Sequence, residues 1–477
     1  MNRPPRRSRK PRSQSPPSTE PTTAGGYRLL RGFARLLVGL FYRRVEVIGG
    51  ERIPTSGPLI VAANHQNALV DAMVLLATVP RRLRPVAKAP LFRHPLVAPF
   101  LRLAGAIPVH RRQDPGSDPA QNEAMFRAAT TTLGSGGAIL IFPEGVSQAE
   151  PTLMPLRTGA ARMALAVASA APEPLAVTLL PVGLVYHEPG AFRTGWALVL
   201  VGTPVPIRDG VALSRTAPEA AVRHVTDRLA EALRQLIVEA RDRKLLRLVR
   251  AAEAIWRAES GEGGDAAART AWMQRATRAY RYLLEREPVR MEALTSVLER
   301  YAKDLELAGL GDRQLSRSYT PPAVWRYALR EGLSLLLGLP LAMWGVVLHL
   351  LPYRLTNVAV RLGHPSGDVE ATYKLVAGVV LYPLCWLAEG WSAWRVGGRW
   401  ALGLFVTSLL PAGFFALTWG ERLGRVRREA RGFLQFLLRR DLHARLLERR
   451  RALMDELAEL ARRVPDAVLA GSTEAGP

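Results

Sequence analysis

The sequence predicts an α/β domain with a sheet flanked by helices, followed by a helical region and then by membrane helices. Up to residue 236, short apolar segments alternate with helical patterns. Such alternation is typical of a sheet covered by helices. From residue 237 to 330 the pattern is helical, and three long apolar runs lie in the last third of the chain. These runs approach the length needed to cross a bilayer.

The composition narrows the class of partner. Lysine and arginine number 65 and aspartate and glutamate 41, which gives a net charge of +24 over 477 residues. Such a balance favours either nucleic acid or an anionic membrane. The apolar runs favour the membrane, and no nucleic-acid-binding module is recognisable, so we expect no nucleic-acid partner. The single cysteine, Cys385, excludes a disulfide framework within the chain.

The N-terminal region combines a basic tail with an amphipathic helix. Residues 1–26 are rich in Pro, Arg, Ser and Thr and are predicted to be disordered. Tyr27–Arg44 has apolar side chains on one face and arginines on the other. Such a helix either lies in a membrane interface or packs on its own domain. It opens the α/β domain, residues 27–236, which shows no export signal and is expected on the cytoplasmic face.

The elements of the α/β domain follow from local pattern. Strands are expected where short apolar segments end at turn residues, namely twice within Val45–Ala63 and then at Leu83–Val86, Ala138–Phe142, Leu175–Val185 and Ala197–Gly202. Helices are expected at Leu69–Ala77, Asn122–Leu133 and Thr158–Ala170. The ends of such strands can converge at one edge of a sheet, where α/β folds place their sites.

The second half of the chain is predicted to be helical and membrane-associated. Ala220–Ser260 has the pattern of one long amphipathic helix. The membrane region, residues 331–420, holds three apolar runs at about 333–351, 375–394 and 400–419. Residues 421–477 form a basic amphipathic helix and tail, which the positive-inside rule places in the cytoplasm. Two and three crossings both stay open, because the first run is either a crossing or an interfacial segment.

One histidine and one acid stand out near the start of the α/β domain. An apolar run ends in Asn64 and His65, and Asp71 follows six residues after the histidine, near the start of the next helix. In such a pair the histidine can take a proton from a hydroxyl while the acid fixes the tautomer of the ring. The alternative is a structural histidine that caps the next helix.

Three further stretches lie at strand ends or turns. Arg111 follows a strand-like segment, Glu144 and Gly145 follow the strand Ala138–Phe142, and Pro181 lies at a turn in a later strand. An arginine can grip a phosphate, and a carboxylate can accept hydrogen bonds from a polyol. Taken singly, Arg111 can equally be a solvated surface charge and Glu144 a helix cap. No cluster of metal ligands is apparent, so no metal is expected.

Four blocks in this order carry a resemblance. N-H-Q-N-A-L-V-D, G-A-I-P-V-H-R, F-P-E-G and L-P-V-G resemble the blocks of the glycerolipid acyltransferases, the lysophosphatidate and glycerol-3-phosphate acyltransferases with an N-H-x4-D motif. The resemblance covers about Tyr27–Leu236 and implies a mixed sheet flanked by helices. It implies that His65 is the general base, oriented by Asp71. It assigns substrate binding to Asn64, Arg111, Glu144, Gly145, Arg157 and Pro181.

Two departures from the usual pattern refine the resemblance. The spacing here is H-x5-D, and the third block reads F-P-E-G-V-S-Q, without the arginine that commonly follows the glycine. Both features, with L-M-P-L-R-T-G-A-A-R-M-A at Leu153–Ala164, are more similar to the fungal-type glycerol-3-phosphate/dihydroxyacetone-phosphate acyltransferases. On this interpretation Arg157 supplies the missing cation.

The predicted function is that of a membrane-bound O-acyltransferase in phospholipid biosynthesis. An acyl group would pass from acyl-CoA or acyl carrier protein, as co-substrate, to a hydroxyl of glycerol-3-phosphate or 1-acylglycerol-3-phosphate. No other cofactor is expected, and Ala89–Leu103 is the candidate path for the acyl chain. The acceptor, the donor and the chain length stay open. The alternatives are a lipid hydrolase or transacylase with the same His/Asp pair, and a non-catalytic lipid-binding membrane protein.

Overall fold

The computed structural model describes most of the chain. The described ranges are 23–110, 119–170, 177–187, 192–193, 195–240, 243–260, 266–308, 311–315, 321–438 and 440–470. Most of the predicted disordered tail, and Arg111, lie outside these ranges. Helix α1 (Ala24–Phe41) begins within the last three residues assigned to that tail.

Seven strands of the described part form one mixed sheet. They are β1 (Arg44–Ile48), β2 (Leu59–Ala63), β3 (Leu83–Lys88), β4 (Ile107–Val109), β5 (Ala138–Ile141), β6 (Thr178–His187) and β7 (Trp196–Val201). Their spatial order is β1-β7-β6-β2-β5-β3-β4, and every neighbouring pair is parallel except β6 and β7. The predicted fold class, a mixed sheet flanked by helices, is confirmed. The carboxyl ends of β2, β5 and β6 therefore meet at one edge of the sheet.

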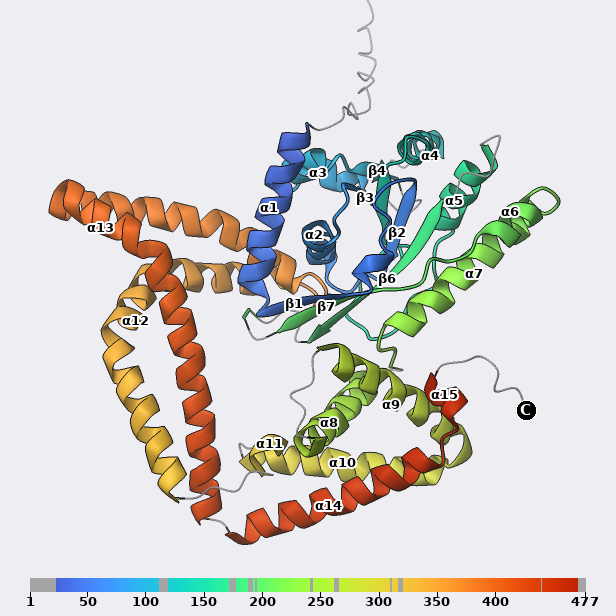
Figure 1. The fold of residues 1–477 in the computed structure, drawn as a ribbon. Coiled ribbons are helices and arrows are strands. Elements are labelled where there is room, and N and C mark those ends of the chain that lie inside the picture. Colours follow the sequence, from blue (N-terminus) through green and yellow to red (C-terminus); the bar gives the residue numbers. More distant parts are fainter. Residues whose placement is uncertain are drawn as a thin grey trace, which may run out of the picture.

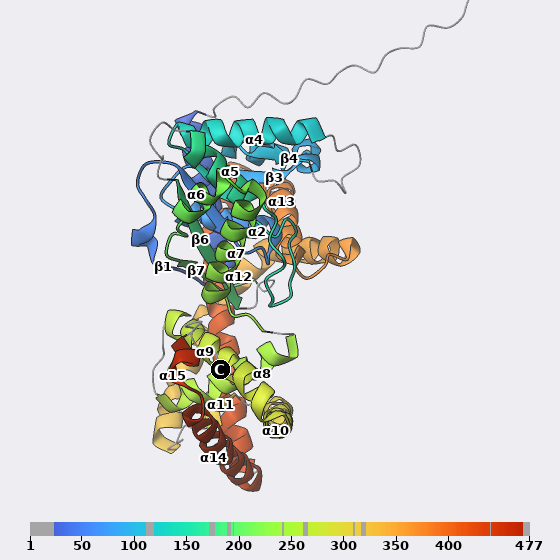
Figure 2. The same cartoon turned by 90° about the vertical axis from the view of Figure 1, so that its right-hand side faces the viewer.

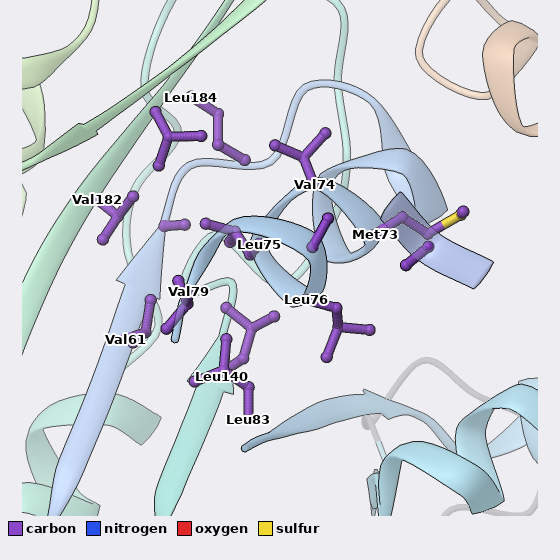
Figure 3. Close-up of a cluster of buried hydrophobic side chains, with 14 of the residues drawn as sticks. Val61, Met73, Val74, Leu75, Leu76, Val79, Leu83, Leu140, Val182 and Leu184 are labelled. Atoms are coloured by element: carbon purple, nitrogen blue, oxygen red, sulfur yellow. The ribbon is translucent and has the colours of Figure 1, made fainter. Parts of the chain in front are cut away.

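Helices cover both faces of this sheet (Figure 1). Helices α1 and α2 (Ala68–Thr78) pack on one face, while α4 (Pro119–Gly134), α5 (Gly159–Ala170) and α7 (Pro218–Leu236) pack on the other. Strand β2 serves both cores, because Val61 and Ala63 face α2 whereas Ile60 and Ala62 face the opposite layer. Figure 3 shows the apolar cluster around α2, which anchors the helix that carries Asp71. The remaining short elements are η1 (Gly50–Arg52), η2 (Ala89–Arg93), α3 (Ala98–Ala104) and α6 (Arg208–Ser214).

Helix α1 is shifted from its predicted position at Tyr27–Arg44. It begins earlier because the side chain of Thr23 accepts a hydrogen bond from the backbone N–H of Gly26 at 3.2 Å. It ends at Phe41 because the following residues enter β1, which pairs with β7. One face of α1 packs on its own domain, whereas Leu29 on the outer face is 76% exposed. Contact of this outer face with a membrane stays a prediction.

The predicted continuous helix over Ala220–Ser260 is wrong. Helix α7 ends at Leu236, and α8 begins at Arg243. The intervening residues are compatible with a helix, but tertiary contacts override that preference. The backbone N–H of Ala240 donates to the carbonyl of Pro151, and Val238 is buried in a cluster with Leu198.

A helical region follows the sheet domain and lies below it in both views (Figures 1 and 2). It packs against β6 and β7 through a buried cluster that contains Leu198, Val249 and Met273. It contains α8 (Arg243–Ser260), α9 (Ala266–Arg286), α10 (Pro288–Ala308), α11 (Asp312–Leu315), α14 (Arg440–Arg462) and α15 (Asp466–Ala470). Helices from both sides of the apolar region thus share one core, in which Leu294 and Leu453 are buried.

The three predicted apolar runs lie in two long helices, α12 (Pro321–Gly363) and α13 (Glu370–Leu438). Both are long and apolar enough to cross a membrane, and only 22% and 17% of their most apolar windows are buried. Such exposure differs from that of a core helix in a soluble domain. Helix α12 continues through Pro340, whereas α13 bends at Gly398, whose φ is 63°. The number of crossings stays a prediction.

Candidate active site

His65 and Asp71 lie in direct contact at the edge where β2 ends. The Nδ1 atom of His65 lies 2.8 Å from Oδ2 of Asp71. Asp71 lies in the first turn of α2, and its side chain is fully buried, whereas the side chain of His65 is 15% exposed. The acid therefore lies behind the ring, and the imidazole is the member of the pair that reaches solvent.

The carboxylate of Asp71 is held by two further donors. Its Oδ2 accepts a 2.8 Å hydrogen bond from the backbone N–H of Asn67, and its Oδ1 accepts a 2.6 Å bond from the hydroxyl of Tyr186. Burial, followed by the nearby charge of Asp71, raises the pKa of Tyr186, so the phenol stays a neutral donor. Since an ionised carboxylate only accepts, Nδ1 of His65 carries the proton and Nε2 is left as the base.

A second tyrosine supports this arrangement. The Nδ2 atom of Asn67 donates a 2.8 Å hydrogen bond to the hydroxyl of Tyr42. The rings of Tyr42 and Tyr186 stack with their centroids 5.6 Å apart. Burial, with a smaller contribution from Asp71, raises the pKa of Tyr42 above its ordinary value. These contacts join the residue after α1, the start of α2 and the end of β6 around one carboxylate.

Asn64 links two strands just before His65. Its Nδ2 donates to the carbonyl of Leu184 at 3.0 Å, and its Oδ1 accepts from the N–H of the same residue at 2.6 Å. The residue is 1% exposed. The side chain of Asn64 thus fixes the end of β2 against β6. Contact of Asn64 with substrate stays a prediction.

Glu144 holds the backbone of His65. Its Oε1 accepts a 2.7 Å hydrogen bond from the N–H of His65, and its Oε2 accepts a 2.9 Å bond from the N–H of Met154. Burial raises the pKa of Glu144, and these two backbone donors oppose that shift. The N–H of Gln148 donates to the carbonyl of His65 at 3.0 Å, and the ring of Phe142 stacks on the imidazole at 4.1 Å. The loop after β5, residues 143–148, therefore fixes both backbone polar groups of the histidine.

Gly145 and Arg157 lie side by side at this loop. Gly145 has a φ of 75°, and a Cβ there would lie 3.4 Å from Cγ of Arg157. The N–H of Arg157 donates to the carbonyl of Pro143 at 2.7 Å. This exposed arginine therefore lies beside the loop that contains the third block. Its binding of a ligand stays a prediction.

One predicted site residue lies away from the others, and another lies outside the described residues. Pro181 is buried within β6 opposite Ala62, inside the sheet and not at its edge. Arg111 follows β4 but lies outside the described residues. Among the residues that the structure describes, no group of three or more His, Cys, Asp and Glu side chains is placed to hold a metal.

Comparison with known proteins assigns the segment that contains these site residues to a protein family. Residues 44–185 match the family model described as Acyltransferase. These residues form an acyltransferase-family domain. The match contains His65, Asp71, Glu144 and Arg157, so the suspected family is confirmed on the segment that builds the site.

Three relatives illustrate the similarity. An uncharacterized acyltransferase of Schizosaccharomyces pombe is 25% identical over 308 residues, covering 46% of this chain and 45% of the relative. The 1-acyl-sn-glycerol-3-phosphate acyltransferase alpha of Mus musculus is 30% identical over 138 residues, covering 29% of this chain and 46% of the relative. Glycerol-3-phosphate O-acyltransferase 1 of Saccharomyces cerevisiae is 24% identical over 275 residues, covering 54% of this chain and 35% of the relative. The chain spans less than half the length of each of these relatives.

Sequence reasoning missed several residues of the acyltransferase domain. Tyr42 and Tyr186 have no local pattern that points to the site. Tyr186 reaches Asp71 from β6, and Tyr42 contacts Asn67 from the end of α1. Gln148 acts through its backbone, so its side chain type carries no signal. Asn67 lies inside the first quoted block, and its place at the N-terminus of the next helix was the one available hint.

Proposed function

We propose that the chain is a membrane-associated O-acyltransferase that moves a fatty acyl group from a thioester to a hydroxyl of a phosphorylated glycerol. The observation that carries the proposal is the 2.8 Å contact between buried Asp71 and the partly exposed ring of His65. The relatives are named for acylation of glycerol-3-phosphate and of 1-acyl-sn-glycerol-3-phosphate, which supports an acceptor of this class.

The reaction needs one base and no acyl-enzyme. The Nε2 atom of His65 takes the proton of the acceptor hydroxyl, and the oxygen attacks the thioester carbonyl. The tetrahedral oxyanion then collapses, the carbon–sulfur bond breaks, and the imidazolium returns the proton to the leaving thiolate. Asp71 stabilises the imidazolium without taking a proton itself. Backbone N–H groups near the strand ends are the expected donors to the oxyanion.

The acceptor phosphate and the acyl chain need different surroundings. Arg157, exposed beside Gly145, is the described cation that we assign to the phosphate, together with Arg111. The acyl chain is assigned to Ala89–Leu103, where Leu96 and Leu103 are 43% and 37% exposed. The two long apolar helices support a membrane location. We assign the acyltransferase domain to the cytoplasmic face, because the arginine-rich segment after the apolar runs favours that side.

A lipid hydrolase would use the same pair of residues, with water in place of the alcohol. The two reactions differ in their dependence on the acceptor. A transferase releases thiol only as the acceptor is acylated, whereas a thioester hydrolase releases thiol and free fatty acid without it. The proposal favours transfer, because the neighbouring Arg157 provides a cation for a phosphorylated acceptor.

The test uses the full chain in membranes with labelled acyl-CoA. Glycerol-3-phosphate, dihydroxyacetone phosphate and lysophosphatidate are offered in parallel, and labelled lipid, free fatty acid and thiol are measured. His65→Ala should lower transfer by about 10²–10⁴-fold. His224→Ala, which removes an imidazole from α7, should retain wild-type rates. Acceptor-independent thiol release, or equal loss in both variants, would contradict the proposal.

A further inference from the structure

The segment between the two apolar helices reaches the active-site loop. Residues 364–369 connect α12 to α13, and Oδ2 of Asp368 accepts a 2.5 Å hydrogen bond from the hydroxyl of Ser147. The other oxygen of Asp368 accepts a 2.6 Å bond from the hydroxyl of Ser366. Both carboxylate oxygens are engaged, so the orientation of Asp368 toward the acyltransferase domain is fixed.

The contact continues into the first turns of α13. Ala371 is fully buried in the same apolar cluster as residues of α1 and α2, and Leu375 packs against that cluster. Figure 1 shows α13 starting beside the sheet and running outward past α1. The bond between Ser147 and Asp368 is therefore part of a packed junction between the apolar helices and the acyltransferase domain.

Ser147 belongs to the loop that positions the histidine. Within residues 143–148, Glu144 accepts from the N–H of His65, and the N–H of Gln148 donates to the carbonyl of His65. Asp368, which binds Ser147, therefore restrains a loop that is hydrogen-bonded to both the backbone N–H and the carbonyl of His65. The same loop carries Gly145, against which Arg157 lies.

We propose that Asp368 is a positioning residue of the acyltransferase site, and that the segment between the apolar helices forms part of the wall of that site. The inference rests on the proposed function. Asp368 lies far outside residues 44–185, so the acyltransferase domain takes part of its active-site support from the apolar helices. Acceptor binding, which depends on the loop 143–148, is thereby coupled to the packing of helices exposed to lipid.

The experiment compares variants of the full chain reconstituted in lipid vesicles. Asp368→Ala and Ser147→Ala each remove one partner and should raise the KM for the acceptor about tenfold, with a smaller change in the KM for acyl-CoA. The double variant should be no worse than either single variant, because both remove the same bond. Asp368→Asn keeps an oxygen that can accept from Ser147 and should restore most of the affinity.

Glu421→Ala is the matched control. Glu421 also lies on α13 and joins it to the acyltransferase domain, through Arg193 at 3.4 Å and Arg43 at 3.9 Å. These partners lie beside the edge strand β1 and outside the loop 143–148. If Asp368 only docked the helices, Glu421→Ala would raise the acceptor KM equally. That outcome, an unchanged KM in Asp368→Ala, or additive effects in the double variant would overturn the inference.

Hydrogen exchange separates this inference from the proposed function. Hydrogen exchange needs no measured activity. The backbone amides of residues 144–148 should exchange faster in Asp368→Ala than in the wild type. Unchanged exchange overturns the positioning role. Faster exchange in a chain that shows no transfer supports the junction and contradicts the proposed function alone.

Discussion

The hydroxyl of Tyr186 donates a 2.6 Å hydrogen bond to Oδ1 of Asp71, the carboxylate that contacts His65. The acid behind the base is therefore held from β6 as well as from its own helix. A hydrogen bond to a charged group contributes about 1.5–3 kcal/mol, and the acceptor would otherwise stay buried without this donor. The bond must therefore influence the orientation of Asp71 and, through it, that of the imidazole.

Tyr186→Phe should lower kcat/KM about tenfold, because it removes this donor and leaves the ring in place. Tyr42→Phe is the matched control, since the hydroxyl of Tyr42 accepts a hydrogen bond from the side chain of Asn67. Steady-state rates of both variants, with thermal unfolding measured in parallel, provide the check. Equal losses in the two variants would mean that the ring stack, and not the bond to Asp71, sets the rate.

Asp71→Asn should lower the catalytic rate much more than Tyr186→Phe does. The carboxylate accepts from His65, from the N–H of Asn67 and from Tyr186. An amide presents its own hydrogens to one of these donors and favours the wrong tautomer of the imidazole. In the serine-protease triad the corresponding change costs about 10⁴-fold in kcat, and a loss of that order is expected here. A variant that folds normally and retains wild-type kcat would remove Asp71 from the mechanism.

Stability should depend on the ionisation of Glu144. Burial raises the pKa of Glu144 in the folded chain, so the unfolded chain releases this proton at lower pH. Between the two pKa values the folded state binds more protons, and stability therefore falls as pH rises. Its contribution is fully present below the unfolded pKa and is lost as pH rises through the folded pKa.

Glu144→Gln removes this titration, although it also weakens one of the two backbone contacts. The Tm of the wild type relative to Glu144→Gln should therefore fall as the pH is raised from about 4 to 8. Differential scanning calorimetry of both proteins in the same detergent provides the measurement. The contributions of other titrating groups cancel in the Tm difference between the two proteins. A relative Tm that rises with pH would contradict the assigned sign.

The sequence was informative where the chemistry is local. His65 and Asp71 are separated by one turn and the start of a helix, so an apolar run followed by a helical pattern sufficed to bring them together. Glu144 was found because it directly follows a buried strand. Its role differs from a solvent-facing ligand, since its oxygens bind backbone N–H groups of His65 and Met154.

Contacts between segments far apart in the chain could not be predicted from local sequence patterns. Tyr186 lies 115 residues from Asp71, and only the parallel register of β2 and β6 brings the two together. Ser147 and Asp368 are 221 residues apart, and their contact depends on how the apolar helices dock. Neither Ser147 nor Asp368 has a local pattern that distinguishes it from an ordinary polar loop residue.

Gly145→Ala separates backbone strain from the loss of a ligand site. Gly145 adopts a φ of 75°, and a new Cβ would lie 3.4 Å from Cγ of Arg157. Gly57 has a φ of 81° with nothing within 4 Å of its added Cβ, so Gly57→Ala carries the strain without the contact. Both variants should lose about 1–3 kcal/mol of stability.

Only Gly145→Ala should also raise the KM for the phosphorylated acceptor, because its new methyl group contacts the side chain of the arginine assigned to the phosphate. Arg157→Ala should raise the same KM at least as far, whereas Arg157→Lys should recover part of the affinity, since a lysine retains charge without the bidentate grip. The KM for acyl-CoA serves as the internal reference in each variant. If Gly145→Ala and Gly57→Ala lose stability alike and both keep the wild-type acceptor KM, the cation that binds the phosphate must be sought elsewhere, with Arg111 as the next residue to test.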